Sequence, residues 1–217
     1  MSRREEKKPI MKFKLKGRVI FFATNNFNKF NEVRRVLSEY NIASAMLRVK
    51  TAEVQSDNLS EIAQTSALDA FRKCNLPVIV EDAGLFVDAL RGFPGPYAAY
   101  TYKTIGNAGL LKLMENVEDR KATFQSVIAY YDGQSAPLCF EGEAAGKITN
   151  KERRRNGKSG FGFDPIFQPA ESAKTFAEMT VEEKNGFSHR ASAVRKFAEW
   201  YKKQNSKPAQ QDPCSAS

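Results

Sequence analysis

The sequence contains little cysteine. Only Cys74, Cys139 and Cys214 occur in 217 residues, and their number and spacing suit neither a disulfide framework nor a metal site. No apolar run approaches the ~20 residues that a membrane-spanning helix needs. The first eight residues are charged, unlike the apolar segment of a secretory signal. These absences indicate a protein of the reducing cytoplasm with no membrane partner.

The charge is positive and unevenly placed. The net charge is +9, of which residues 1–18 contribute +6, and a second basic cluster lies at 151–158. A basic balance suits an anionic partner such as a nucleotide, a nucleic acid or a membrane surface. For the N-terminal cluster we favour a solvated tail instead. We expect a flexible basic arm over 1–16, one domain over 17–204 and a disordered polar tail over 205–217.

Glycine-rich phosphate loops and dinucleotide-binding fingerprints are also absent, but another phosphate-binding pattern is present. An apolar strand at 19–23 stops at a polar turn, and apolar residues at helical spacing follow directly. The free N–H groups and the dipole of such a helix start attract anions. The turn offers neutral donors and one cation: Thr24, Asn25, Asn26 and Lys29. Alone the motif is weak, because asparagine-rich turns cap helices in many proteins.

A short apolar run at 77–80 leads directly into two carboxylates, Glu81 and Asp82. Its β-branched residues predict a strand covered on both faces, and we place the acidic pair at or just past the carboxyl end of that strand. Ligands of open α/β sheets usually bind at this edge. The pair then has two interpretations: a turn or helix cap, or a site for a metal or a general base.

The elements around this strand are those of an α/β protein. We expect a strand at 46–49, an extended segment at 52–55 that leaves Glu53 at a strand end, and an amphipathic helix over 59–71 with Ser60 as candidate N-cap. Together with the strand and helix at the start of the domain and the strand at 77–80, these elements give the order β-α-β-α-β, which predicts a mostly parallel, layered core.

Later residues predict a short helix and a hairpin. The helix covers 106–115, and the hairpin joins strands at 122–131 and 137–143. Gly142 and Gly146 suggest bulges or a bend in the second strand of the hairpin.

Two C-terminal features suggest ligand binding. Phe161 and Phe163 alternate with glycines, so their rings could stack on a planar base, although a hairpin whose rings enter the core is at least as good a local interpretation. His189 and Arg190 begin a final helix with Ser188 as candidate N-cap. Cations gain nothing from the dipole at a helix start, so a ligand with acceptors would explain them better.

Four segments together resemble the Ham1-like family of inosine/xanthosine triphosphate pyrophosphatases. The segments are ATNNFNK (23–29), EDAGL (81–85) with GFPGPY (92–97), GFGFDPIF (160–167), and AEM (177–179) continuing through EK (183–184) to SHR (188–190). Their order and spacing match the family throughout, and the likeness covers roughly residues 18–203.

The resemblance implies a fold, a reaction and partners. The fold is mixed α/β, with a long curved central sheet, two lobes and a cleft between them, and the protein is a homodimer. The reaction is hydrolysis of ITP, dITP and XTP to the nucleoside monophosphate and pyrophosphate, with Mg²⁺ as cofactor.

The resemblance also implies site residues. It places Glu53 and Asp82 near the metal, and it has Asp82 orient or deprotonate the attacking water, with Glu81 as their neighbour. The substrate-binding residues that it implies are Thr24, Asn25, Asn26, Lys29 and Lys184 at the phosphates, Phe161 or Phe163 stacked on the purine, Asp164, His189 and Arg190 at the base edge, and Ala83 and Gly162 beside them.

Two positions depart from the family's pattern. Asn25 stands where a glycine is commonest. Leu68 stands near the place where many members carry a lysine that faces the phosphates, with Arg72 and Lys73 one turn later. The residue that makes this phosphate contact therefore stays open.

Two other functions compete with this interpretation. Maf-like pyrophosphatases share the architecture but favour other nucleotides, and the segments at 161–164 and 188–190 argue against them. A nucleic-acid-binding protein is suggested by the net charge and by the run Arg153–Arg155, and would bind polynucleotide with a steep salt dependence. The basic residues lie in tails and a loop, however, while the acidic pair lies at the sheet edge, so no specific nucleic acid is expected.

Overall fold

The computed structural model describes residues 19–52, 54–155 and 161–206. Three expectations lie outside these ranges: the basic arm over 1–16, the metal ligand Glu53, and most of the polar tail expected over 205–217. The expected start of that tail is wrong, because residues 205 and 206 still belong to the last helix. None of the helices within the described ranges is long and apolar enough to cross a membrane.

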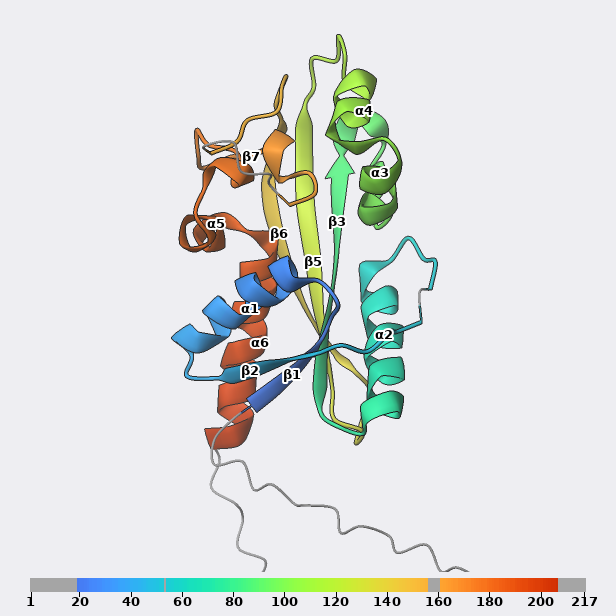
Figure 1. The fold of residues 1–217 in the computed structure, drawn as a ribbon, viewed down its shortest axis with the longest axis vertical. Helices are drawn as coiled ribbons and strands as arrows, with labels where there is room; N and C mark the ends of the chain where they lie inside the picture. Colours follow the sequence, from blue (N-terminus) through green and yellow to red (C-terminus); the bar gives the residue numbers. More distant parts are fainter. Residues whose placement is uncertain (1–18, 53, 156–160, 207–217) are drawn as a thin grey trace, which may run out of the picture.

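A seven-stranded mixed sheet forms the centre of the molecule (Figure 1). Its order is β2-β1-β3-β5-β6-β7, and β4 pairs with β3 on the same side as β1. The strands are β1 (Val19–Ala23), β2 (Ala43–Leu47), β3 (Val78–Val87), β4 (Pro94–Gly95), β5 (Lys121–Tyr131), β6 (Leu138–Ile148) and β7 (Phe167–Pro169). The expected mixed sheet is confirmed.

The narrower expectation of a mostly parallel core is wrong. Only β1 pairs in parallel, with β2 and with β3, whereas the pairings of β3 with β4 and β5, of β5 with β6 and of β6 with β7 are antiparallel. The β5–β6 hairpin attaches directly to β3, because antiparallel neighbours need no crossover helix. The parallel pattern therefore ends at β3.

Helices cover both faces of this sheet. In the lower half of Figure 1, α1 and α6 lie on one side and α2 on the other, while α3 and α4 flank the upper half of β3. The helices are α1 (Phe27–Glu39), α2 (Leu59–Cys74), α3 (Ala98–Thr104), α4 (Gly106–Leu113), α5 (Val181–Phe187) and α6 (His189–Ser206). Short 3₁₀ turns cover Asp88–Leu90, Asp164–Ile166 and Phe176–Glu178. Of the helices, α3 and α5 were not predicted from the sequence.

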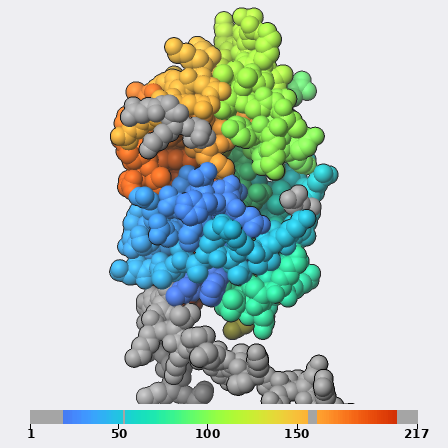
Figure 2. Space-filling view, in the orientation of Figure 1, coloured from blue at the N-terminus to red at the C-terminus, as the bar shows by residue number. Residues whose placement is uncertain are grey.

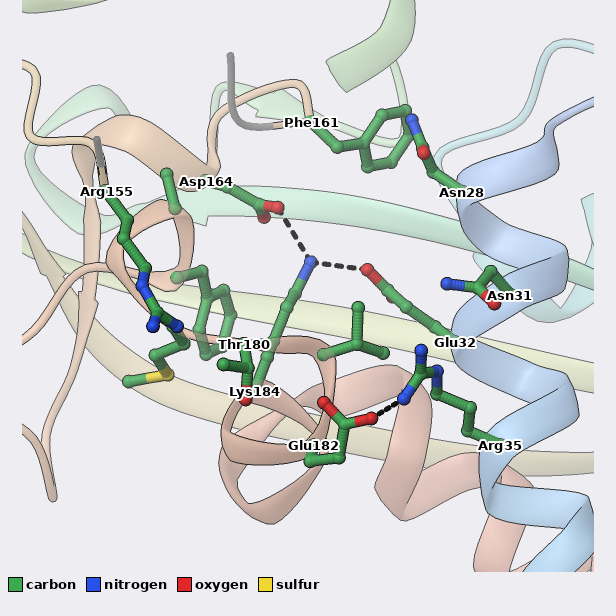
Figure 3. A pocket seen from close by; sticks show the side chains of 14 residues that line it. Asn28, Asn31, Glu32, Arg35, Arg155, Phe161, Asp164, Thr180, Glu182 and Lys184 are labelled. Carbon is green, nitrogen blue, oxygen red and sulfur yellow. Dashed lines mark hydrogen bonds and ion pairs between the residues drawn. The ribbon is translucent and has the colours of Figure 1, made fainter. Parts of the chain in front are cut away.

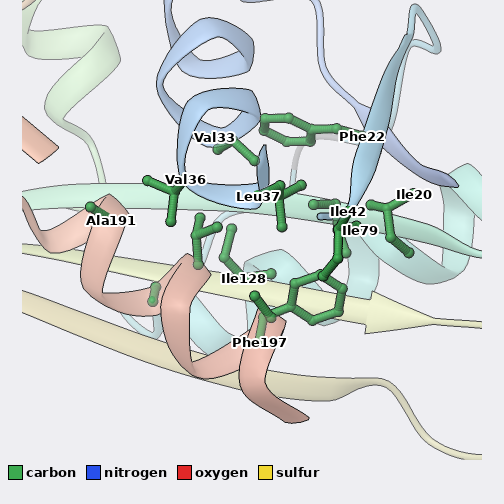
Figure 4. Close-up of a cluster of buried hydrophobic side chains, with 13 residues drawn as sticks. Ile20, Phe22, Val33, Val36, Leu37, Ile42, Ile79, Ile128, Ala191 and Phe197 are labelled. Atoms are coloured by element: carbon green, nitrogen blue, oxygen red, sulfur yellow. The ribbon is translucent and has the colours of Figure 1, made fainter. Parts of the chain in front are cut away.

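Side-chain alternation along β3 divides the core. Ile79 packs with α1 and α6 in the cluster drawn in Figure 4, whereas Val78 and Val80 pack against α2 on the other face. Leu85 and Val87 enter a third cluster in the upper half, with α4 and the segment around Phe163. The predicted double coverage of this strand is confirmed, because successive side chains point to opposite faces.

The expected end of this strand at the acidic pair is wrong. β3 continues through Glu81 and Asp82 to Val87, because all ten of its residues pair with β5 in an unbroken register. On its other edge, β1 pairs only with Val78 and Ile79, and β4 only with Leu85 and Phe86. The acidic pair thus lies in mid-strand, where the ladder between β1 and β4 is interrupted within the described chain.

Capping residues agree with the sequence in part. Ser188 caps α6 as predicted, since its hydroxyl accepts from the Ala191 N–H at 3.1 Å. The predicted cap Ser60 is wrong: the Asn58 side chain caps α2 and accepts from the Ser60 N–H at 2.8 Å. The strand predicted at 46–49 corresponds to β2, which begins at Ala43 and ends at Leu47.

The glycines of β6 allow close packing rather than bulges. Gly142 and Gly146 lie in a continuous register with β5, so the predicted bulges are wrong. A Cβ at Gly142 would lie 2.2 Å from the His189 carbonyl oxygen, and one at Gly146 would lie 2.4 Å from the Gln168 carbonyl oxygen. Gly142 therefore lets the start of α6 approach the sheet, which sets the position of His189 and Arg190.

Candidate active site

A cavity of about 430 Å³ lies beside the interrupted edge of β3. Figure 2 shows the surface near it, where the blue α1 region meets the green α3–α4 region and the orange C-terminal segments. Ten of the predicted site residues line the cavity: Asn26, Lys29, Asp82, Ala83, Phe161, Gly162, Phe163, Asp164, His189 and Arg190. Because Asp82 and Ala83 point to opposite faces of β3, the cavity wraps around the strand's open edge.

The polar turn before α1 organises one end of this cavity. The Asn26 side chain caps α1 and accepts from the N–H groups of Asn28 and Lys29 at 3.0 and 3.2 Å. Thr24 Oγ1 accepts from the Asn26 N–H at 3.1 Å, and Asn25 Nδ2 reaches the Val49 carbonyl oxygen at 3.5 Å. Thr24 and Asn25 are therefore supports of the turn and do not line the cavity.

Five buried charged side chains form a cluster behind the cavity. Lys184 Nζ lies 2.8 Å from Glu32 Oε1 and 2.8 Å from Asp164 Oδ2, as Figure 3 shows. Arg190 pairs with the second Glu32 oxygen and, through Nε at 2.9 Å, with Glu81 Oε1. The cluster joins α1, β3, the 164–166 turn, α5 and the start of α6.

Lys29 extends this cluster to the cavity wall. Its Nζ lies 2.7 Å from Glu81 Oε2 and 3.3 Å from the Glu81 carbonyl oxygen. The remaining oxygen of Glu81 also accepts from Ser126 Oγ at 2.7 Å. Both carboxylate oxygens of Glu81 therefore pair with cations, Oε2 with Lys29 and Oε1 with Arg190, which identifies Glu81 as the residue that holds these two side chains in place.

Burial and charge act in opposite directions on these carboxyls. Burial would raise the pKa of Glu32, but Lys184 and Arg190 outweigh it and lower the pKa from 4.5 to about 2. Burial would likewise raise the pKa of Glu81, but Arg190 and Lys29 hold it far below its usual range. Both carboxyls are therefore ionised at neutral pH, and their charges raise the pKa values of Lys184 and Arg190 against the effect of burial, so these two cations stay protonated.

Glu32 was not predicted as a site residue. It lies on the inward face of α1 beside the fully buried Val33 and Val36, and only 6% of its surface is exposed. An acidic residue within the apolar stripe of a helix is the sequence signal that could have found it, because buried carboxylates need partners.

Asp82 differs from Glu81 in the face of β3 to which it points, in its exposure and in its lack of an ion pair among the described residues. It points to the opposite face of β3, is partly exposed and makes no ion pair with a described residue. Burial raises the pKa of Asp82, nearby Lys29 opposes this, and the charge of Glu81 adds to it. A carboxyl with a raised pKa on a cavity wall is a candidate general base.

The two phenylalanines take different positions. Phe163 is 3% exposed, belongs to the upper core and meets Tyr102 edge to face at 5.6 Å. Phe161 is partly exposed and lines both the 430 Å³ cavity and a neighbouring one of about 500 Å³, drawn in Figure 3. The core interpretation therefore holds for Phe163, whereas stacking of a base on Phe161 stays a prediction.

His189 lines the same cavity with a neutral ring. The imidazole stacks on Phe124 with centroids 4.6 Å apart and planes 8° apart. Burial, followed by the charges of Arg190 and Lys184, keeps its pKa well below the usual range. Its Nδ1 is buried and has no hydrogen-bond partner within the described chain. Such an orphan atom is usually satisfied by water or a ligand.

Comparison with known proteins decides the family. The Ham1 family model matches residues 20–200. The chain belongs to the Ham1 family.

Its relatives in this family match over nearly their full length. A protein of Methanopyrus kandleri named dITP/XTP pyrophosphatase is 48% identical, covering 84% of this chain and 96% of the relative. A protein of the same name from Thermococcus kodakarensis is 47% identical, covering 83% and 96%. The solved HAM1 protein of Coxiella burnetii superposes with a TM-score of 0.73 at 30% identity, covering 86% and 99% of the two chains.

Many Ham1-like proteins carry a phosphate-facing lysine near the position of Leu68, and the residue that replaces it in this chain remains to be located. Leu68 and Arg72 lie on α2 and do not line the cavity. Lys73 Nζ is 2.7 Å from Asp69 Oδ2 and 2.7 Å from the Lys50 carbonyl oxygen. A lysine that the sequence did not single out, Lys103 of α3, lines the cavity instead.

Two residues of the run Arg153–Arg155 form ion pairs within this Ham1 protein. Arg153 Nη2 lies 2.7 Å from Glu178 Oε2, and Arg154 pairs with Glu152. Arg155 lines the neighbouring cavity together with Lys184. Two of the three charges are therefore neutralised locally, which weakens the argument for a nucleic-acid surface.

Proposed function

We propose that this protein hydrolyses the non-canonical purine nucleoside triphosphates ITP, dITP and XTP to the nucleoside monophosphate and pyrophosphate. The observation that carries the proposal is the 430 Å³ cavity, which brings Asp82, the N-terminal turn of α1 and the ring of Phe161 to one place. Its volume is within the usual range for small-molecule sites. The names of the Ham1 relatives, dITP/XTP pyrophosphatase, point to the same reaction.

In the proposed mechanism Asp82 is the general base. Its carboxylate accepts a proton from water, the water oxygen bonds to the α-phosphorus, and the bond from that phosphorus to the bridging oxygen breaks as pyrophosphate leaves. Lys29 and the N-terminal turn of α1 hold the phosphates, because a fixed geometry and neutralised charge lower the barrier. Glu81 keeps Lys29 in position through its 2.7 Å ion pair.

The other end of the cavity suits the purine. Phe161 offers a ring face for stacking, and Asp164, His189 and Arg190 surround the base edge in this proposal. Arg190 is always a donor, so it matches the 6-keto oxygen of inosine and xanthine and mismatches the amino group of adenine. An unpaired buried donor costs roughly 1–3 kcal/mol. The ion pairs of Arg190 with Glu32 and Glu81 fix the direction of its guanidinium.

Mg²⁺ is the proposed cofactor, with Asp82 as a ligand. The fit rests on Asp82 lining the cavity without an ion-pair partner in the described chain, since Mg²⁺ is usually held by one or two carboxylates together with substrate phosphates and waters. No group of three or more candidate metal-binding side chains gathers among the residues described. Glu53, outside those residues, is the second ligand that the resemblance implies. Bound Mg²⁺ supplies charge neutralisation at the phosphates.

Pyrophosphate release from ITP, XTP, GTP, ATP and UTP with Mg²⁺ tests the proposal. We expect fast turnover of ITP and XTP, loss of that turnover on addition of EDTA, and about a 10³-fold loss of kcat for Asp82→Asn. Asp88→Asn is the matched control, because Asp88 follows β3 directly and does not line the cavity. Equal turnover of UTP would favour the Maf-like alternative, and an active Asp82→Asn variant would remove Asp82 from the mechanism.

The assembly and location stay predictions. The homodimer is implied by the family resemblance and is measured by light scattering on the purified chain. The cytoplasmic location, and the expected lack of a specific nucleic acid partner, rest on the composition and charge pattern alone.

A further inference from the structure

The charged side chains around the cavity balance one another. The cations Lys29, Lys184 and Arg190 are paired with the carboxylates of Glu32, Glu81 and Asp164, three charges against three. Asp82 adds one further negative charge. A triphosphate carries about four negative charges at neutral pH. The cluster therefore provides donors for a polyanion but no net positive charge.

Lys103 is the exception on the cavity wall. It lies in the last turn of α3 and is exposed, and its ammonium group makes no ion pair or hydrogen bond with a described residue. Its helix is anchored beside the cavity, because the ring of the adjacent Tyr102 packs against Phe163 at 5.6 Å. The other α3 residues on this wall are Ala98, Ala99 and Tyr102, none of which carries a positive charge, so Lys103 is the cation that α3 brings to the cavity.

The position of α3 adds to the argument. Lys29 approaches the cavity from α1, in the lower half of Figure 1, while Lys103 approaches from α3 in the upper half. A polyphosphate between them would meet one cation from each side. Neither Leu68 nor its neighbours Arg72 and Lys73 supplies that second cation, since none of them lines the cavity.

We propose that Lys103 binds the polyphosphate chain of the substrate and provides the uncompensated positive charge of the site. The proposal rests on the proposed function, which it extends by one substrate-binding residue. An ammonium group on a flexible stem acts as a point charge toward phosphate oxygens, so charge rather than an exact fork geometry is the property that matters.

The first test measures binding without catalysis. Inorganic tripolyphosphate is titrated into the wild type, Lys103→Met and Lys103→Arg by calorimetry. We expect the Kd to rise about tenfold for Lys103→Met, as for the loss of one charge-assisted hydrogen bond, and to stay within about threefold for Lys103→Arg. The matched control is Lys121→Met, because Lys121 is an exposed lysine of β5 that does not line the cavity.

The second test uses the reaction. Lys103→Met should raise the KM for ITP about tenfold and change kcat much less, and high salt should reduce this difference. A wild type that does not bind tripolyphosphate, or a Lys103→Met variant with Kd and KM within twofold of the wild type, would overturn the role of Lys103. A wild type that binds tripolyphosphate but releases no pyrophosphate from any nucleotide would instead overturn the proposed function.

Discussion

Replacing Glu32 by glutamine should test the buried charge cluster most directly. The substitution keeps the size of the side chain but leaves Lys184 and Arg190 with one carboxylate fewer. The Glu32 side chain is 7% exposed and lies 2.8 Å from Lys184 Nζ. Removing one partner of a buried ion pair typically costs about 3–5 kcal/mol.

The pKa of Glu32 leads to a similar magnitude. Burial would raise this pKa, but the two cations lower it from 4.5 to about 2. A difference of that size corresponds to about 3 kcal/mol of folding free energy at neutral pH. Because the pKa is lowered on folding, this contribution is fully present above pH 4.5 and is lost as the pH falls toward 2. By pH 3 less than about half of it should remain.

Urea unfolding at pH 7 and pH 3 measures both quantities. Trp200, the only tryptophan of the chain, packs against Tyr130 and Phe140 and reports unfolding by its fluorescence. We expect Glu32→Gln to be about 3 kcal/mol less stable than the wild type at pH 7, with a smaller difference at pH 3.

An exposed ion pair provides the control for this experiment. Glu182 pairs with Arg35 at the rim of the neighbouring cavity, and its side chain is 64% exposed. Glu182→Gln should cost less than about 1 kcal/mol. If Glu32→Gln costs no more than this control, or if its cost does not change with pH, the reasoning about the cluster is refuted.

Two further predictions concern the cavity. Burial raises the pKa of Asp82 above 3.8, and the proposed reaction needs the ionised carboxylate. The value of kcat/KM for ITP should therefore fall as the pH drops through a midpoint above 3.8. A flat profile down to about pH 4 would contradict this role of Asp82. Phe161→Ala should raise the KM for ITP about 5- to 100-fold with little loss of stability, because the ring is expected to stack on the base. Phe163→Ala should instead cost about 3–5 kcal/mol of unfolding free energy, because this ring is buried in the core. The opposite pattern in kinetics and urea unfolding would reverse the roles assigned to the two rings.

Local sequence signals determined the elements that present the site. The turn before α1, its Asn26 cap and the Ser188 cap of α6 follow from residues within one helical turn of each other. The apolar run of 77–80 determined a buried strand, because β-branched side chains favour a doubly covered position. The four family segments also placed ten of the predicted site residues on one cavity.

The tertiary structure decided what those local signals could not. Whether β3 ends at Asp82 or continues to Val87 depends on pairing with β5, whose partner residues for this stretch lie 35 to 45 positions further along the chain. Glu32 becomes part of the site only because Lys184, 152 positions away, packs against it.

The same holds for the side chains that were ambiguous or overlooked. Phe161 and Phe163 each follow a glycine in the sequence, and only the tertiary structure buries Phe163 in the upper core and leaves Phe161 partly exposed on the cavity wall. Lys103 carries no motif, yet α3 directs it into the same space. Periodicity and capping act within a few residues, whereas burial, ion pairing and cavity shape arise from segments brought together by the fold. The sequence alone therefore determined the elements with strong local signals, and the tertiary structure decided the length of β3, the place of α3 and the charge of the site.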